Sequence, residues 1–259
     1  MTILRVDNIC RSFGGLVALD KVGFDVEQGC IKGIIGPNGA GKTTLFHVIS
    51  GLLHPDGGQI YLENERITGL KTHQIARRGI SRTFQNLSLF GNMTVIENVM
   101  VGCHRCTRSG MLAAAIRSPR QRREERELRA AATKHLESVG LASEADKAVG
   151  SLSFGQRRMV ELARALATEP RLLLLDEPAS GLNTRETDDL GDLIRHIRDS
   201  GVTVLLVEHD MSLVMDICDD IVVLDFGKNI AEGSPAEIRN DPNVVDIYLG
   251  GDFQNAAGA

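Results

Sequence analysis

The residues best suited to chemistry lie in the stretch Gly36-Pro-Asn-Gly-Ala-Gly-Lys-Thr-Thr44. Its pattern, G-x-x-x-x-G-K-[ST], follows the apolar run Ile31–Ile35 and precedes the helical run Thr44–Ser50. Glycines allow backbone N–H groups to close around a phosphate, Lys42 would neutralise the β- and γ-phosphates, and the Thr43 hydroxyl would ligate Mg²⁺. We therefore expect a nucleotide phosphate to be bound by Gly36, Pro37, Asn38, Gly39, Ala40, Gly41, Lys42, Thr43 and Thr44.

Two carboxylates follow the apolar run Leu172–Leu175. Asp176 would hold Mg²⁺, mostly through water, and Glu177 would accept a proton from the water that attacks the γ-phosphate. A strand that ends in Asp-Glu is often only a polar strand end. Combined with the glycine-rich loop, the pair predicts the second half of a nucleotide site.

Three further residues could complete this site. Gln85 has an amide able to reach Mg²⁺ or the attacking water, and His209 ends the next buried strand, where it could contact the γ-phosphate. Phe13 could stack against a base. Each has a structural alternative, because glutamine is usually solvated, a histidine at a strand end is usually structural, and phenylalanine is usually core.

The segment Ser151-Leu-Ser-Phe-Gly-Gln-Arg157 precedes a long helical run. Ser151 or Ser153 could cap that helix, since a serine oxygen accepts a bond from an unpaired backbone N–H. A helix start with small residues also suits an anion. From the residues alone, a helix cap and half of a phosphate site both remain open.

The elements that would position these residues follow from hydrophobic periodicity. Alternating or apolar stretches predict strands at Ile3–Val6, Val22–Val26, Ile31–Ile35, Gln59–Leu62, Leu172–Leu175, Val202–Val207 and Ile221–Leu224. Helical patterns cover about Met93 to Gly140 and about Arg185 to Asp199, and Ser234 and Asp241 start two short terminal helices. Fully apolar strands imply a parallel sheet with covering helices, so the pattern predicts an α/β sheet interrupted by a mainly helical insert.

Composition restricts the class of protein. The chain has 259 residues, 42% of them apolar and 24% charged, and a net charge of −5, which does not favour general nucleic-acid binding. No apolar run approaches the ~20 residues that span a bilayer, and the first residues lack a signal-peptide pattern, so a cytosolic location is expected. The spacing Cys103-His-Arg-Cys106 matches a metal or redox pair, but thiols on a helix are the favoured interpretation.

Taken in order, these motifs resemble the ATP-binding subunits of ABC transporters, from Phe13 to about Gly233. The matching segments are the aromatic loop at Phe13, Walker A at Gly36–Thr43, the Q-loop residue Gln85, the signature at Leu152–Gln156, Walker B at Leu172–Asp176 with Glu177, the D-loop at Ser180–Asn183 and the switch residue His209. The signature distinguishes this family from other P-loop ATPases, which lack it. The resemblance implies a P-loop (RecA-like) ATPase core with an antiparallel β subdomain and an inserted helical subdomain.

The resemblance also implies boundaries and partners. A single ABC ATPase domain would span residues 1–259, with the core and β subdomain at 1–90 and 164–233, the helical subdomain at 91–163 and a helical tail at 234–259. A second ATPase subunit, identical or different, would sandwich ATP and Mg²⁺. Two transmembrane permease subunits would join this pair at the inner face of the cell membrane, with an extracytoplasmic solute-binding protein acting indirectly and no nucleic acid involved.

In the family, the signature serine and glycine bind the γ-phosphate of ATP held by the opposite subunit. The resemblance assigns that role to Ser153 and Gly155, beside Gln156. Two residues depart from the family pattern. Phe154 replaces the first glycine of LSGGQ, and Asn183 stands where aspartate is commoner in the D-loop.

Several stretches resemble one subgroup, the ATPases of branched-chain amino-acid importers: Phe13–Leu16, Arg82–Gln85, Met93–Asn98, Glu208–Met211, Leu213–Met215 and Tyr248–Gly250. Urea or short-chain amide importers are an alternative within the group. A soluble ABC ATPase acting on ribosomes or DNA usually has two cassettes or a long coiled-coil insert, unlike this chain. A P-loop GTPase would need an Asn-Lys-x-Asp motif, which is absent, and a non-catalytic module would be expected to lose Lys42, Glu177 or His209.

Overall fold

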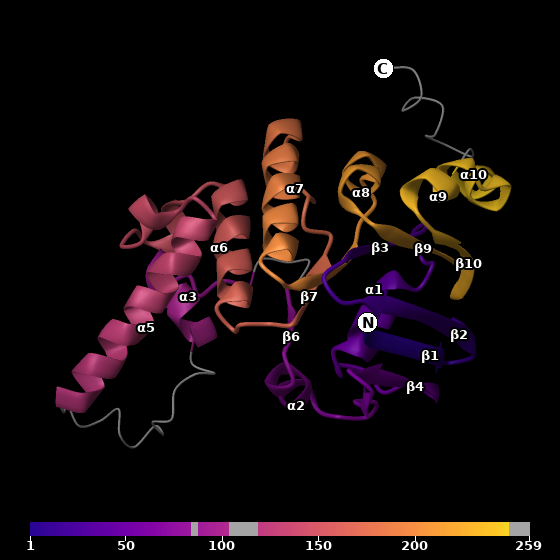
Figure 1. The fold of residues 1–259 in the computed structure, drawn as a ribbon, viewed down its shortest axis with the longest axis horizontal. Helices are drawn as coiled ribbons and strands as arrows, with labels where there is room; N and C mark the ends of the chain where they lie inside the picture. Colours follow the sequence, from indigo (N-terminus) through magenta and orange to yellow (C-terminus); the bar gives the residue numbers. More distant parts are fainter. Residues whose placement is uncertain (84–87, 104–118, 249–259) are drawn as a thin grey trace. The chain divides into compact units, whose positions relative to one another are not determined.

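The computed structural model describes residues 1–83, 88–103 and 119–248 (Figure 1). The chain forms two compact units, one made of Met1–Arg82 with Arg171–Ala259 and the other of Thr83–Pro170. The first unit contains the two β-sheets with their helices, and the second is mainly helical. The insertion of a helical segment into an α/β unit, predicted from the strand pattern, is confirmed.

The larger sheet of the first unit has six strands in the order β10–β9–β3–β8–β7–β6. The strands are β3 (Ile31–Ile35), β6 (Ile80–Arg82), β7 (Leu172–Asp176), β8 (Thr203–Val207), β9 (Asp220–Asp225) and β10 (Lys228–Gly233). All neighbours from β9 to β6 are parallel, and β10 pairs antiparallel with β9. Every residue of β3, β7 and β8 is buried, as expected for apolar strands covered on both faces. The carboxyl ends of these strands therefore meet at one edge of the sheet.

The smaller sheet is antiparallel, with the order β2–β1–β4–β5. Its strands are β1 (Thr2–Phe13), β2 (Leu16–Glu27), β4 (Gly57–Leu62) and β5 (Glu65–Arg66). Helix α1 (Lys42–Ile49) contacts both β2 and β7, and its Leu45 and Phe46 share one apolar core with residues of both sheets. Burial of each such side chain contributes about 1.5–3 kcal/mol. This core fixes the helix that begins at the glycine-rich loop.

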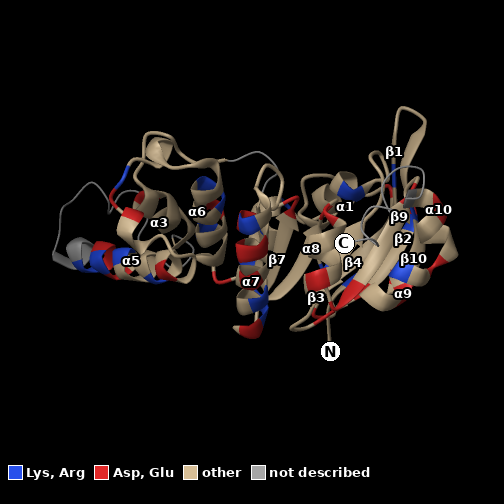
Figure 2. Ribbon diagram, turned by 90° about the horizontal axis from the view of Figure 1, so that it is seen from above, with Lys and Arg blue, Asp and Glu red and all other residues tan. Residues whose placement is uncertain are grey.

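The described residues of this unit also form the helices α2 (Thr72–Arg77), α7 (Thr184–Asp199), α8 (Met211–Ile217), α9 (Pro235–Asn240) and α10 (Pro242–Tyr248). In α7, buried Leu190, Ile194 and Ile197 form an apolar stripe, while acidic and basic residues are intermixed along the helix (Figure 2). Asn183 caps α7, since its side chain accepts a hydrogen bond from the Glu186 N–H at 3.0 Å. The D-loop residue that departs from the family pattern is therefore also a helix cap.

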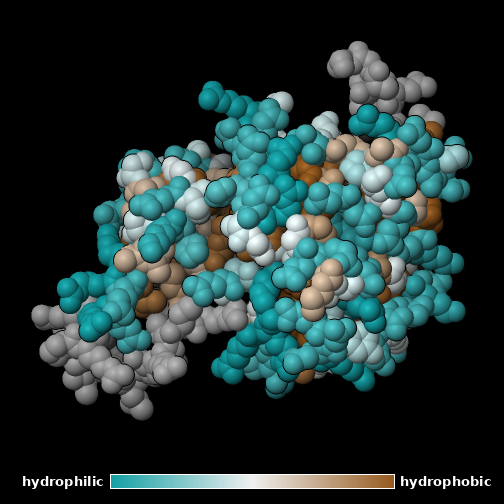
Figure 3. Space-filling view, viewed as in Figure 1, coloured by the Kyte–Doolittle hydropathy of each residue, from teal (hydrophilic) through white to brown (hydrophobic). Residues whose placement is uncertain are grey.

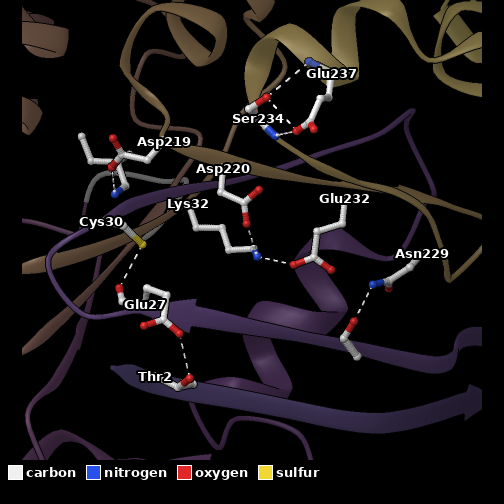
Figure 4. Close-up of polar contacts among 12 residues, drawn as sticks. Thr2, Glu27, Cys30, Lys32, Asp219, Asp220, Asn229, Glu232, Ser234 and Glu237 are labelled. Atoms are coloured by element: carbon white, nitrogen blue, oxygen red, sulfur yellow. Dashed lines mark hydrogen bonds and ion pairs between the residues drawn. The ribbon is translucent and has the colours of Figure 1, made fainter.

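A buried lysine joins the central strand of the large sheet to its edge hairpin (Figure 4). Lys32 of β3 is 2% exposed and donates to Asp220 of β9 at 2.6 Å and to Glu232 of β10. Its ammonium also lies 5.6 Å from the ring centroid of Phe24 in the small sheet. Because the ammonium is buried while both carboxylates are partly exposed, the lysine depends on these two partners, and the cluster links β9 and β10 to β3.

The second unit has its own apolar core. Helices α3 (Val95–Cys103), α5 (Pro119–Ser138) and α6 (Phe154–Leu166) are joined with the 3₁₀ turns η2 (Ala142–Glu144) and η3 (Val149–Ser151). Val99, Leu136 and Val160 bring all three helices into one cluster. At Gly102 a Cβ atom would lie 2.2 Å from the Arg164 carbonyl oxygen, so glycine allows α3 to approach α6 closely.

The elements missed by sequence analysis are short or lie at sheet edges. The three-residue strand β6 has no room for an alternating pattern, and β10 is partly exposed and mixes polar with apolar residues. The predicted helical stretch from about Met93 to Gly140 corresponds to α3 and α5, and residues 104–118 between them lie outside the described residues.

Figure 3 shows a face covered mainly by hydrophilic residues, with apolar residues in small separate areas. Within the three described ranges, none of the helices combines the length and the apolar character that a bilayer-spanning segment needs.

Candidate functional site

The loop between β3 and α1 needs glycine at two positions, because a side chain at either one would clash with neighbouring backbone. Gly36 and Gly41 have φ angles of 149° and 104°. A Cβ atom would lie 2.1 Å from the Leu224 carbonyl oxygen at Gly36, and 2.6 Å from that of Ala18 at Gly41. The loop leads directly into the N-terminus of α1, where N–H groups and the helix dipole favour an anion. The predicted segment Gly36–Thr44 therefore has the form of a phosphate-binding loop.

Lys42 is buried at the start of α1 and folds back over this loop. Its ammonium donates hydrogen bonds to the carbonyl oxygens of Gly36 at 2.6 Å and Pro37 at 3.0 Å. Burial lowers the pKa of Lys42, and the negative charges of Glu177 and Asp176 partly oppose that shift. The positive charge thus lies at the loop and within electrostatic reach of both carboxylates.

The two carboxylates occupy the end of β7. Asp176, its last residue, is buried, and its Oδ2 accepts a hydrogen bond from Arg82 at 2.6 Å. Glu177 has a φ angle of 48°, in the left-handed region that residues other than glycine rarely adopt, although its N–H donates to the Val207 carbonyl oxygen at 2.9 Å. Strained backbone of this kind is concentrated at functional sites, and here it turns the chain sharply as it leaves the sheet.

His209 lies two residues beyond β8, at the same edge of the sheet. Its Nδ1 is 4.0 Å from a carboxylate oxygen of Glu177 and 3.8 Å from one of Glu208, distances longer than a hydrogen bond. The His209 side chain is 61% exposed, so the ring faces Glu177 and is also accessible to a ligand. The structure thus brings Lys42, Glu177 and His209 together beside Asp176, as the sequence predicts.

Arg82 was missed by sequence analysis, although it belongs to the site. It ends β6, next to β7, and its buried guanidinium pairs with Asp176 and donates to the Ser50 hydroxyl at 3.0 Å. The sequence does contain a sign of this role, which is an arginine at the end of the short strand Ile80–Arg82. Without a predicted β6, nothing placed it beside Asp176.

Glu208 was also missed. Its carboxylate is fully buried and accepts hydrogen bonds from the N–H groups of Ala179 at 2.7 Å, His209 at 3.0 Å and Asp210 at 3.4 Å. Burial raises the pKa of Glu208, and these backbone hydrogen bonds act in the opposite direction. The side chain therefore ties the segment after Glu177 to the turn that carries His209.

The signature segment lies in the helical unit and begins α6. Ser153 caps this helix, since its Oγ accepts from the Gln156 N–H at 3.2 Å and the Gln156 side chain accepts from the Ser153 N–H at 3.0 Å. Gly155 is buried, whereas Phe154 is exposed, with the Arg158 guanidinium 5.9 Å from its ring centroid. The cap interpretation is confirmed by this geometry, and the phosphate interpretation stays a prediction.

The remaining predicted residues have different outcomes. Phe13, at the end of β1, is exposed and its ring lies under the Arg11 guanidinium at 4.8 Å, so a flat aromatic surface is present near solvent. Gln85 lies outside the described residues, as does Cys106. Cys103 is a buried residue of α3, in agreement with a thiol on a helix.

The oxygen donors at this site fit Mg²⁺ only together with a ligand. Mg²⁺ is usually bound by one or two carboxylates together with phosphates and water. In the described part of the chain, no group of three or more His, Cys, Asp and Glu side chains could hold a metal ion. Asp176 at the end of β7 and the exposed Thr43 on α1 supply one carboxylate and one hydroxyl. This donor set suits an ion that arrives with nucleotide phosphates.

Comparisons with known proteins agree with this geometry. Residues 19–180 match the family model described as "ABC transporter", and residues 228–254 match the one described as "Branched-chain amino acid ATP-binding cassette transporter". The chain is 49% identical over 249 residues to the high-affinity branched-chain amino acid transport ATP-binding protein BraF of Pseudomonas aeruginosa. That alignment covers 96% of this chain and 98% of BraF.

Solved structures show the same fold. The ADP conformation of MJ1267, an ATP-binding cassette of an ABC transporter, has a TM-score of 0.84 and 36% identity, and the match covers 97% of this chain and all of that one. The dimeric structure of MJ0796, a bacterial ABC transporter cassette, has a TM-score of 0.77 and 26% identity, with 90% and 98% coverage.

Proposed function

This chain belongs to the ABC transporter family of ATP-binding, ATP-hydrolysing cassettes, and we propose that it powers the import of branched-chain amino acids. The observation that carries the substrate class is the match of residues 228–254 to cassettes of branched-chain amino-acid transporters, together with near-full-length identity to BraF. Leucine, isoleucine and valine are the proposed solutes.

The phosphates of ATP are held by the loop between β3 and α1. Backbone N–H groups from Gly36 to Thr44 surround the β-phosphate, and Lys42 supplies the positive charge that the β- and γ-phosphates need. Its two hydrogen bonds to loop carbonyl oxygens support this role, because they hold the ammonium at the loop before any ligand competes for it. Phe13 provides the aromatic surface for the base.

Hydrolysis is carried out at the carboxyl ends of β7 and β8. Glu177 accepts the proton of the attacking water, and His209 across from it contacts the γ-phosphate. Asp176, Thr43 and Gln85 would hold Mg²⁺, which when bound neutralises charge on the phosphates. The support for these assignments is the convergence of Glu177, His209 and Asp176 at one edge.

Dimerisation is a property of ABC cassettes, as the MJ0796 dimer illustrates. In a dimer of this chain with an identical or different cassette, Ser153, Gly155 and Gln156 would contact the ATP held by the opposite subunit. Ser153 and Phe154 are exposed at the start of α6, so a partner can reach them. ATP binds the closed dimer better than the open one and thereby shifts the population.

The wider assembly follows from the same proposal. Two permease subunits bind the cassettes at the inner face of the cell membrane, and an extracytoplasmic protein delivers the solute. Residues 91–163 form the coupling subdomain, residues 1–90 and 164–233 the nucleotide-binding core, and residues 234–259 the tail. These boundaries remain expectations from the family pattern.

Uptake of labelled leucine, isoleucine and valine tests the proposal in cells that lack this chain. Wild type, Lys42→Ala and Lys228→Ala are each added back at equal expression. Lys228 is the matched control, because it is an exposed lysine that pairs with Asp20 on the surface. We expect wild type and Lys228→Ala to restore uptake and Lys42→Ala to fail.

Uptake that does not depend on the chain, in a strain without a second carrier, would contradict the substrate class. Urea and short-chain amides would then be tested in the same strains.

A further inference from the structure

The carboxylate at the end of β7 is held by a buried arginine from the neighbouring strand. Arg82 Nη2 lies 2.6 Å from Asp176 Oδ2, and the two side chains are only 6% and 3% exposed. The strands are parallel neighbours, with Arg82 opposite Leu174. A charge-assisted contact of this length in a buried place fixes the orientation of both groups.

The same guanidinium is also attached to the helix that follows the phosphate loop. Nη1 donates to the Ser50 hydroxyl at 3.0 Å, and Ser50 in turn donates to the Phe46 carbonyl oxygen at 2.7 Å. The Arg82 guanidinium carbon lies 5.6 Å from the Phe46 ring centroid. Arg82 thus joins the C-terminal end of α1, the helix whose N-terminus follows the phosphate loop, to the end of β7, which carries Asp176.

We propose that Arg82 is a positioning residue for Asp176: it fixes the carboxylate for Mg²⁺ and offsets its charge, so that the metal binds more tightly together with nucleotide than alone. This inference rests on the proposed function, because it takes Asp176 as the metal-binding carboxylate. It concerns a residue to which the family motifs assign no role.

The positive charge of Arg82 lies close enough to Asp176 to affect cation binding. A positive group in contact with Asp176 Oδ2 repels any cation that approaches the same carboxylate, and repulsion is stronger in a buried site than in water. The phosphates of ATP supply the additional negative charge that makes metal binding favourable. Arg82 therefore lowers the affinity for a divalent cation alone more than the affinity for a cation with nucleotide.

The guanidinium fork of Arg82 fixes the position of its partners. Two separate nitrogens serve Asp176 and Ser50 at once, which a lysine ammonium on its flexible stem reproduces poorly. Charge and positioning can therefore be separated by two substitutions: Arg82→Gln removes the charge, and Arg82→Lys keeps the charge but removes the fork.

The test uses the full chain and MnCl₂ as the metal probe, with bound Mn²⁺ measured by electron paramagnetic resonance in the absence and presence of ADP. The variants are Arg82→Gln, Arg82→Lys, Asp176→Asn and the control Arg195→Gln. Arg195, on α7, pairs with the exposed Asp192 at 2.8 Å and with the exposed Asp216. Circular dichroism establishes that each variant is folded, and kcat and KM for ATP are measured with Mg²⁺.

We expect Arg82→Gln to bind Mn²⁺ alone about tenfold more tightly than wild type, and Arg82→Lys and Arg195→Gln to bind it like wild type. Both Arg82 variants should lower kcat about tenfold with KM for ATP changed less than about twofold, because a metal-holding carboxylate is misplaced while nucleotide binding persists.

Unchanged Mn²⁺ affinity in folded Arg82→Gln, with Asp176→Asn weakening Mn²⁺ binding in the presence of ADP, would overturn the inference and leave the proposed function intact. Full kcat in Arg82→Lys would overturn the positioning role of the fork. If Asp176→Asn binds Mn²⁺ with ADP like wild type, Asp176 is not the metal carboxylate, and both the inference and that part of the proposed function fail.

Discussion

Replacing Glu208 by alanine tests whether a buried carboxylate holds the hydrolysis site together. The substitution removes the acceptor of three backbone N–H groups, those of Ala179, His209 and Asp210. Leaving a buried donor unsatisfied costs about 1–3 kcal/mol, and the contact with Asp210 is long. We therefore expect the free energy of unfolding to fall by about 2–4 kcal/mol, measured by urea denaturation followed by circular dichroism.

The pH dependence of this loss has a definite sign. Burial raises the pKa of Glu208 in the folded chain above 4.5, so the folded state binds its proton more tightly than the unfolded state does. That contribution to stability is fully present below about pH 4.5 and is lost as pH rises through the folded pKa. The difference between wild type and Glu208→Ala should therefore shrink as pH rises above about 4.5.

Glu237→Ala is the matched control, because Glu237 also accepts from a backbone N–H, that of Ser234 at 2.8 Å, but is exposed. Hydrogen bonds from Ser234 lower the pKa of Glu237 below 4.5, so its contribution is constant above that pH and is lost only in acid. Equal losses in the two variants, or a difference for Glu208→Ala that grows with pH, would refute the reasoning.

Three further substitutions give expected outcomes in other parts of the first unit. Lys42→Met removes the donor to the Gly36 and Pro37 carbonyl oxygens, so the free energy of unfolding should fall by about 1–3 kcal/mol while binding of labelled ATP is lost; retained binding would contradict the role of Lys42. Asn183→Ala removes the N-cap of α7 and should lower the free energy of unfolding, measured in urea, by about 1 kcal/mol. Asn183→Ser should restore most of this loss. An unchanged value in Asn183→Ala would show that the cap does not stabilise the fold. Gly36→Ala forces a Cβ to within 2.1 Å of the Leu224 carbonyl oxygen and should lower both the thermal midpoint and ATP affinity; a wild-type midpoint would show that the loop relaxes.

The parts of the fold that sequence predicts well are those where burial imposes a clear pattern. The strand of residues 31–35 was predicted with its observed bounds, and the strands at 172 and 203 within a residue, because fully buried strands are continuous apolar runs. Helix α9 begins directly after its N-cap Ser234, as the sequence Ser234-Pro-Ala-Glu237 indicates. Edge strands such as β10 lack that pattern, because one side of them faces solvent.

In the site, too, some residues could be predicted from local sequence patterns and others could not. Lys42, Asp176, Glu177 and His209 could be placed because each follows a recognisable strand or loop. Arg82 could not, since its importance comes from pairing with a residue 94 positions away in the sequence, across the β6–β7 register. Such long-range contacts depend on strand order, which no local pattern contains.

The role of Glu208 could not be predicted for a different reason. As a charged residue at the end of an apolar strand it is typical of a solvated strand end, yet it is fully buried. Only the positions of the Ala179, His209 and Asp210 N–H groups show that the carboxylate has partners. Whether a buried charge is tolerated is decided by hydrogen-bond geometry, which the sequence alone does not contain.

The most direct test of the account is phosphate release by the purified chain and its Glu177→Gln variant, with binding of labelled ATP measured in the same samples. Glu65→Gln serves as the control, because Glu65 is an exposed glutamate far along the chain from Glu177. We expect Glu177→Gln to slow hydrolysis by roughly 10²–10⁴-fold while ATP affinity stays within about twofold of wild type. Turnover close to that of wild type would contradict the assignment of Glu177 as the base, and with it the proposed mechanism.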